Sequence, residues 1–242
     1  MSRCSIWLVT ASAYADVAIG IVYESWGDRR QRFDRAHQRV WDYRVPIERK
    51  RYARVLHVAQ QHSARATQDN WSNVLEVGCA QGLFTMELAP HCQALTACDI
   101  SPRACESAAE RCHLYQHVHI EQMDITQEMF SGQFDLVFAL DLLEAMHGCQ
   151  RVVGVADKLI DAVRPGGLLI FSGSRLPERM RDSWWTRRLI EGADNHLACL
   201  LGRVDVRLVH QELYPEAGGE IPGYPQHLIA IIQKTTGWPA TS

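Results

Sequence analysis

The segment at residues 74–82, VLEVGCAQG, constrains the fold of this chain more than any other part. Its first four residues are largely apolar, and Gly78 and Gly82 follow at a short spacing. Glycine adopts positive φ angles without steric penalty, so this pattern predicts a buried strand, a tight turn and the start of a helix. Asp99 follows about twenty residues after the turn, a spacing typical of sheets that bind a nucleoside at this edge.

The rest of the chain alternates short apolar segments with amphipathic ones, a pattern typical of a parallel sheet covered by helices. The predicted fold class is α/β, with a Rossmann-like, doubly wound, mostly parallel seven-stranded sheet, helices on both faces and an N-terminal helical cap. The expected strands are residues 74–77, 95–99, 117–121, 134–140, 168–172, 204–213 and 227–232. The expected helices are 83–88, 101–109 and 150–163, with a turn at 164–167.

The length of 242 residues fits one α/β domain. We expect a leader at 1–27, whose order the sequence leaves open, a helical cap at 28–66, and a core at 67–242 with a lid at about 175–202. Within the cap, a proline at position 46 separates two helices, because proline disfavours helix in the residue before it. About ten Arg and Lys residues between positions 29 and 54 predict a solvated helix face.

Charge and composition favour a small partner inside the cell. The formal net charge is −3, so the surface as a whole does not resemble that of a nucleic-acid-binding protein. No apolar stretch approaches the roughly 20 residues that span a bilayer, and the apolar run at 6–9 is too short for a secretory signal, so we expect a cytoplasmic protein. The eight cysteines contain no CxxC pair, which favours reduced thiols and no metal. A soft-metal site remains a weaker alternative at Cys92, Cys98, Cys105 and Cys112.

Acidic residues stand at the ends of several expected strands. In a doubly wound sheet the carboxyl ends of the strands form the ligand crevice, which places Gly78, Asp99, Asp124 and Asp141 at one edge. A carboxylate at Asp99 suits the two hydroxyls of a ribose, and Asp124 suits the amino group of an adenine. Helix capping is the alternative for Asp99, and a surface position is the alternative for Asp124.

Four segments together resemble the class I S-adenosylmethionine-dependent methyltransferases. They are VLEVGCAQG, Asp99 at the end of the second strand, FDLVFALDLLEAM and RPGGLLIFS. Dinucleotide-binding enzymes normally show a third glycine in G-x-G-x-x-G, which this turn lacks. More narrowly, WDYR at 41–44, ERKRY at 48–52 and VGCAQGLFTMELAPHC look like the NodS-like subgroup, whose founding members N-methylate the free amine of a chitooligosaccharide signal.

The resemblance implies S-adenosylmethionine as cofactor, S-adenosylhomocysteine as product, and N-methylation of a small-molecule amine such as an amino sugar or a natural-product intermediate. The residues expected to bind the cofactor are Glu76, Gly78, Cys79, Ala80, Gly82, Asp99, Ile100, Asp124, Ile125, Leu140, Trp41 and Tyr43. An ammonium acceptor must lose a proton before it attacks, so a general base has a role. The candidates are Asp141, Glu144 and His147, which follow the fourth strand.

Several alternatives stay open at this point. Asp141 could instead contact the cofactor or cap a helix, and Trp41 and Tyr43 could pack in the core. The aromatic residues Trp184, Trp185, Tyr214 and Tyr224 could line the acceptor pocket or simply pack. The protein could be an O-methyltransferase, a non-catalytic S-adenosylmethionine-binding protein or, less expected, an RNA methyltransferase that uses its Arg-rich N-terminal face. The sequence does not separate a monomer from a homodimer.

Overall fold

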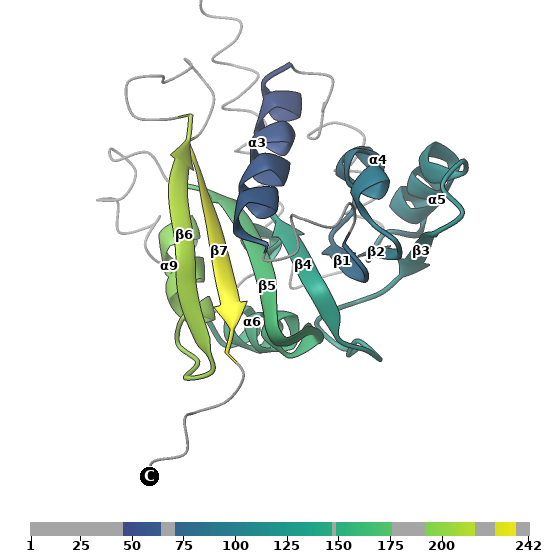
Figure 1. Cartoon of the computed structure of the whole chain (residues 1–242). Helices are drawn as coiled ribbons and strands as arrows, with labels where there is room; N and C mark the ends of the chain where they lie inside the picture. Colours follow the sequence, from purple (N-terminus) through teal and green to yellow (C-terminus); the bar gives the residue numbers. More distant parts are fainter. Residues whose placement is uncertain (1–45, 64–70, 147–148, 176–191, 216–225, 236–242) are drawn as a thin grey trace, which may run out of the picture.

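One sheet of seven strands organises the computed structural model, which describes residues 46–63, 71–146, 149–175, 192–215 and 226–235 (Figure 1). The first five strands in spatial order are parallel, and β7 pairs antiparallel with both β5 and β6. This arrangement confirms the predicted fold class. The spatial order is β3 (Val118–Gln122), β2 (Leu95–Asp99), β1 (Val74–Val77), β4 (Phe134–Leu140), β5 (Val163–Ser174), β7 (His227–Lys234) and β6 (Val206–Tyr214).

Helices cover both faces of the sheet, as expected. Side chains alternate along β4, so that Leu136 and Phe138 pack on one side while Val137 and Ala139 pack on the other. Burial on both sides explains why the parallel strands read as continuous apolar runs. One face carries α3 (Pro46–His62), α4 (Leu83–Leu88) and α5 (Pro102–Cys112), and the other carries α6 (Cys149–Ala162) and α9 (Ala193–Leu200) (Figure 1).

The strand order reverses between β1 and β4, which lie side by side in the sheet. Connections that leave these two strands diverge, and ligands of doubly wound sheets bind in the resulting crevice. The loop after β1 and the loop after β4 lie close together at this point: a Cβ atom added to Gly78 would lie 3.2 Å from Cδ1 of Leu142. A short 3-10 helix, η2 (Leu143–Ala145), follows at this point, and a second one, η1 (Ala89–His91), follows α4.

A local sequence signal explains where α5 begins. α5 starts after Ser101, whose side chain accepts a hydrogen bond from the amide of Ala104 at 3.1 Å, and Pro102 occupies its first position. α3 is described from Pro46 onward, and the residues before it lie outside the described part, so the predicted break between two cap helices stays a prediction. The first cap helix and the leader lie outside the described residues.

The structure differs from the sequence-based expectation at residues 164–167 and adds detail at residues 175–202. The turn predicted at 164–167 lies inside β5, where Val163 already pairs with Phe134 and the register shifts before Leu168, so its assignment as a separate turn is wrong. A left-handed glycine, Gly166 at φ 80, accommodates this irregularity. Of the segment at 175–202, residues 176–191 lie outside the described part, and α9 at its C-terminal end is packed into the core through Leu197 and Leu200.

The arginine side chains of α3 differ in their exposure to solvent. The side chain of Arg49 is 74% exposed, as a solvated helix face requires. Arg51, two positions later, is 1% exposed, so the prediction of a solvated face is wrong for this residue. Among the helices that the structure describes, none combines the length and the apolar character that a membrane crossing requires.

Candidate active site

The turn after β1 has the left-handed geometry that its glycines predict. Gly78, Ala80 and Gly82 have φ values of 82, 48 and 76. The last of these glycines also permits a close approach, because a Cβ on Gly82 would lie 2.7 Å from Cα of Ala108 in α5. The sequence therefore needs glycine at position 82 for two independent reasons, backbone conformation and space.

Asp99 ties this turn to the start of α5. Its Oδ2 accepts a hydrogen bond from the amide of Ala80 at 3.0 Å, and its Oδ1 accepts one from the amide of Ser101 at 2.9 Å. The residue is 7% exposed, so its carboxylate is held by main-chain donors in a buried position. These two hydrogen bonds fix the orientation of the carboxylate at the end of β2.

A shallow recess, partly open to solvent, lies between the ends of β1 and β4. Five of the residues expected to bind a cofactor line it, together with Asp141. Sequence reasoning missed the other three, of which two directly follow the Gly82 turn and the third is an aromatic residue of the cap. The lining consists of Tyr52, Glu76, Gly78, Cys79, Ala80, Leu83, Phe84, Leu140 and Asp141.

Glu76 contributes a buried carboxyl group to the recess. It is 4% exposed, and its Oε2 has no hydrogen-bond partner among the described residues. Burial raises the pKa of this carboxyl to about 7, while the side chain of Thr85 limits the rise and the charge of Asp99 adds to it. A buried acceptor of this kind is suited to a cationic donor such as an ammonium group, which would replace the lost hydration.

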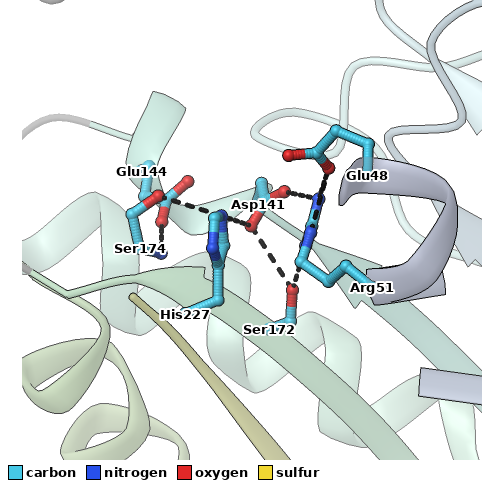
Figure 2. A network of polar contacts seen from close by, with 7 residues as sticks. All are labelled: Glu48, Arg51, Asp141, Glu144, Ser172, Ser174 and His227. Atoms are coloured by element: carbon cyan, nitrogen blue, oxygen red, sulfur yellow. Dashed lines mark hydrogen bonds and ion pairs between the residues drawn. The ribbon is translucent and has the colours of Figure 1, made fainter. Parts of the chain in front are cut away.

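Asp141 lines the opposite wall, in a conformation that is unusual for a residue other than glycine. Its φ is 54, and its amide donates a hydrogen bond to the carbonyl of Ser172 at 2.8 Å. The guanidinium of Arg51 donates from Nη2 to Asp141 Oδ2 at 2.6 Å and from Nη1 to Ser172 Oγ at 2.9 Å (Figure 2). Glu48, on the same helix as Arg51, accepts from Arg51 Nε at 3.0 Å and from Nη2 at 2.8 Å.

Glu144 and His227 extend this cluster on the other side of Asp141 (Figure 2). Oε1 of Glu144 accepts a hydrogen bond from the amide of Ser174. Burial raises the pKa of Glu144 to about 8, and the negative charge of Asp141 adds to the rise. Nε2 of His227 lies 3.8 Å from Asp141 Oδ1 and 3.4 Å from Ser174 Oγ. Arg51, Glu48, Ser172 and His227 were not among the predicted site residues.

Other predicted residues lie beyond the lining of the recess. Asp124 uses its carboxylate within its own loop, where Oδ1 accepts from the amide of Thr126 at 3.0 Å. Ile125 is buried in the core. Ile100 directly follows Asp99 at the end of β2.

One of the remaining predicted residues, Tyr214, lies in the described part of the chain, and the others lie outside it. Tyr214, on β6, is close enough to the cluster for the charges of Glu48 and Arg51 to act on it. In the described part of the chain, no three metal-ligating side chains form a site for a metal ion. The predicted residues outside the described part are Trp41, Tyr43, His147, Trp184, Trp185 and Tyr224.

Comparison with known proteins identifies relatives of this chain. The family Nodulation protein S (NodS) matches residues 34–210. The chain is 34% identical over 130 residues to Nodulation protein S of Rhizobium tropici, which covers 54% of this chain and 52% of that protein. It is 29% identical over 154 residues to Nodulation protein S of Sinorhizobium fredii strain NGR234, which covers 64% of this chain and 66% of that protein. The matches thus span about half to two thirds of the length of these curated relatives.

A solved structure extends the likeness over most of the fold. The crystal structure of the N-methyltransferase NodS from Bradyrhizobium japonicum WM9 in complex with S-adenosylhomocysteine matches with a TM-score of 0.70 and 25% identity. The match covers 85% of this chain and 97% of that chain. This protein therefore belongs to the NodS family and has the fold of class I S-adenosylmethionine-dependent methyltransferases.

Proposed function

We propose that this protein transfers a methyl group from S-adenosylmethionine to the amine of a small-molecule acceptor and releases S-adenosylhomocysteine. The observation that carries the proposal is the buried, unpartnered carboxyl oxygen of Glu76 beside the left-handed Gly78–Gly82 turn. An adenosyl amino acid has an ammonium group that suits this oxygen. The NodS structure from B. japonicum, which contains S-adenosylhomocysteine, supports the choice of this compound.

The residues of the turn fit the other parts of such a cofactor. Asp99, fixed by the amides of Ala80 and Ser101 at the end of β2, supplies the carboxylate that suits the two ribose hydroxyls. Glycine has no side chain, so the main chain of the Gly78–Gly82 turn can approach the ligand closely. When bound, the cofactor supplies a methyl group on a sulfonium, which is already an excellent leaving group. The protein has chiefly to align the acceptor and exclude water.

The acceptor end of the recess favours an amine over an alcohol. Two carboxylates, those of Glu48 and Asp141, share the guanidinium of Arg51, and the carboxyl group of Glu144 lies beyond Asp141 in the cluster of Figure 2. An excess of acidic groups attracts an ammonium ion, whereas a neutral hydroxyl gains less from it. We propose that Asp141, which lines the recess, receives the amine, and that Glu144, which lies beside Asp141, is the candidate base for its proton.

The substrate class that follows is a sugar or metabolite with a free primary amine. The similar NodS protein from B. japonicum is an N-methyltransferase, which supports nitrogen as the methylated atom. The chito-oligosaccharide acceptor implied by the family resemblance is a suitable first probe. A cytoplasmic location follows from the proposal, because the cofactor is an intracellular metabolite.

Calorimetry with S-adenosylhomocysteine tests the cofactor assignment. We expect wild-type protein to bind it, and Asp99→Asn to bind it about 10- to 100-fold more weakly, because one carboxylate acceptor is lost. The matched control is Glu110→Gln, which changes an exposed carboxylate on α5 and is expected to leave binding unchanged. Wild-type protein that binds neither S-adenosylhomocysteine nor S-adenosylmethionine would refute the assignment.

A methyl-transfer assay tests the reaction. Two chito-oligosaccharides of equal length serve as acceptors, one with a free terminal amine and one fully N-acetylated, and mass spectrometry detects a gain of one methyl group. We expect methylation of the free amine alone. Methylation of both sugars would indicate an O-methyltransferase. Binding of S-adenosylhomocysteine without transfer to this sugar or to a panel of metabolite amines would favour a cofactor-binding protein without catalytic activity.

A further inference from the structure

Arg51 stands out because an arginine is almost never fully buried unless its charge is paired. It is 1% exposed, and its guanidinium connects three separate parts of the fold. It contacts Glu48 on its own helix, Asp141 after β4 and Ser172 on β5. In Figure 2 the guanidinium points from α3 toward the carboxylate of Asp141. The side chain thus joins the N-terminal cap to the wall of the recess.

The backbone of Asp141 needs such support. A residue other than glycine at φ 54 is in a left-handed conformation that is costly unless the surroundings fix it. Its amide is held by the carbonyl of Ser172, and its Oδ1 accepts a hydrogen bond from Ser172 Oγ at 3.3 Å. The shortest contact to its carboxylate comes from Arg51, at 2.6 Å from Oδ2. The position of this carboxylate is therefore determined from β5 and from α3 together.

We propose that Arg51 is a positioning residue for the methyl acceptor: it holds the Asp141 carboxylate at the wall of the recess as the group that receives the acceptor amine. Arg51 is not among the residues that line the recess, so it acts through Asp141. The inference rests on the proposed function for the identity of the acceptor. It gives α3, which already contributes Tyr52 to the lining of the recess, a second role in placing Asp141.

The charges around Asp141 show what the arginine does. Glu48 faces Arg51 from α3, Glu144 approaches from η2, His227 lies at 3.8 Å on β7, and Tyr214 on β6 is influenced by the charges of Glu48 and Arg51. Without the guanidinium, Asp141 would face two further carboxyl groups. The buried Asp141 carboxylate would then lack its cation beside Glu48, so it would turn away from the recess or take up a proton.

Two crystal structures with S-adenosylhomocysteine test the positioning without any turnover. We expect Asp141 to lie against the recess in the wild type and to rotate away from it in Arg51→Met. Unchanged placement of Asp141 in the variant would overturn the proposal. This measurement does not depend on the acceptor, so it separates a failure of the inference from a failure of the proposed function. If Arg51→Met does not fold, Glu48→Gln/Arg51→Met removes one of the unpaired carboxylates and serves instead.

Kinetics with the free-amine chito-oligosaccharide provide the second test. We expect kcat/KM for this acceptor to fall about 100-fold in Arg51→Met, the effect typical of a misplaced reacting group. Arg51→Lys keeps the charge but lacks the planar fork, and is expected to lose less activity. The affinity for S-adenosylhomocysteine should stay within about three-fold, because Asp99 and Glu76 are untouched.

The matched control is Arg54→Met, on the same helix. Arg54 also joins α3 to a neighbouring strand, through hydrogen bonds of 2.7 and 2.6 Å to Glu212, but these bonds lead to β6 rather than to Asp141. We expect Arg54→Met to leave kcat/KM unchanged. An equal loss of kcat/KM in both variants, or a loss confined to cofactor affinity, would show that Arg51 only seats the helix.

Discussion

The two halves of the recess are built in different ways. On the cofactor side, the carboxylate of Asp99 is held by the main-chain amides of Ala80, 19 residues away, and Ser101, two residues away. On the side proposed for the acceptor, the Asp141 carboxylate is held by side chains, and Arg51 comes from 90 positions away in the chain. The contact between Arg51 and Ser172 spans 121 positions. One half thus depends on backbone shape, and the other on the identity of single residues brought together by the fold.

This difference predicts which amino-acid substitutions each half of the recess tolerates. A main-chain site withstands most side-chain substitutions but not the loss of a glycine that its conformation requires. A buried side-chain cluster fails when one charged partner is removed, because the others then remain buried without compensation. Substitutions in the two halves should therefore differ in both the size and the kind of their effects.

The largest effect is expected from breaking the acceptor cluster. Arg51→Met should lower the free energy of unfolding by about 3–5 kcal/mol, because the carboxylates of Glu48 and Asp141 stay buried without their cation. Urea denaturation measures the change. Arg54→Met, which removes a partly exposed pair, should cost no more than about 1 kcal/mol. Equal losses in the two variants would remove the distinction between a buried cluster and a surface pair.

On the cofactor side, Gly82→Ala should be the most damaging change to the turn. The new Cβ would lie 2.7 Å from Cα of Ala108, at a φ of 76, and we expect a loss of about 2–5 kcal/mol in stability together with weaker binding of S-adenosylhomocysteine. Gly154→Ala is the control, because Gly154 lies in α6 and a Cβ atom there would have no neighbouring atom within 4 Å. That variant should gain about 0.5–1 kcal/mol. A neutral Gly82→Ala would mean that the turn is not constrained as described.

Glu144 gives the acceptor half a measurable pH dependence. Burial raises its pKa from the ordinary 4.5 to about 8, so between these values the folded state keeps a proton that the unfolded state releases. The free energy of unfolding should therefore fall as pH rises through this range, by up to about 1.4 kcal/mol per pH unit from this one group. Glu144→Gln should remove this part of the slope in denaturation curves, and Glu110→Gln should not. An unchanged slope in Glu144→Gln would contradict the buried environment of its carboxyl group.

Glu76 should change cofactor affinity, with a pH dependence no larger per unit than that of Glu144. Burial raises its pKa to about 7, so at lower pH the carboxyl is mostly protonated and the ammonium of S-adenosylhomocysteine must displace that proton. Affinity should rise with pH below about 7, by up to about ten-fold per unit, and the dependence should flatten in Glu76→Gln. Calorimetry across pH measures it. A wild-type affinity that does not change with pH would argue against Glu76 as the partner of the ammonium.

Much of the sheet could be predicted from the sequence, because each buried parallel strand has a local signal. Val74–Val77 and Phe134–Leu140 form as predicted, since their continuous apolar runs can be satisfied only by burial on both faces. The start of β5 could not be predicted. Its residues 164–167 carry a turn-like composition, and their place in the strand depends on the pairing of Val163 with Phe134. Pairing across the sheet thus overrides local propensity here.

In the site, too, some residues could be located from the local sequence and others could not. The sequence placed Gly78, Ala80 and Asp141 at the edge where the recess lies, because strand ends can be located from the strands themselves. Arg51 was predicted to lie on a solvated face, like the other basic residues of the cap, since a run of arginines gives no sign of which one faces inward. Its burial follows from the way α3 packs over β5 and β7.

The amino-acid sequence alone determined the doubly wound sheet, the left-handed turn and the acidic residue that the turn binds, because these features depend on residues close together in the chain and on backbone conformation. The tertiary structure decided which distant side chains surround Asp141, and with them the charge and accessibility of the acceptor end. A buried ion pair has no local signature, since its partners are selected by how helices and strands pack rather than by their spacing in the sequence.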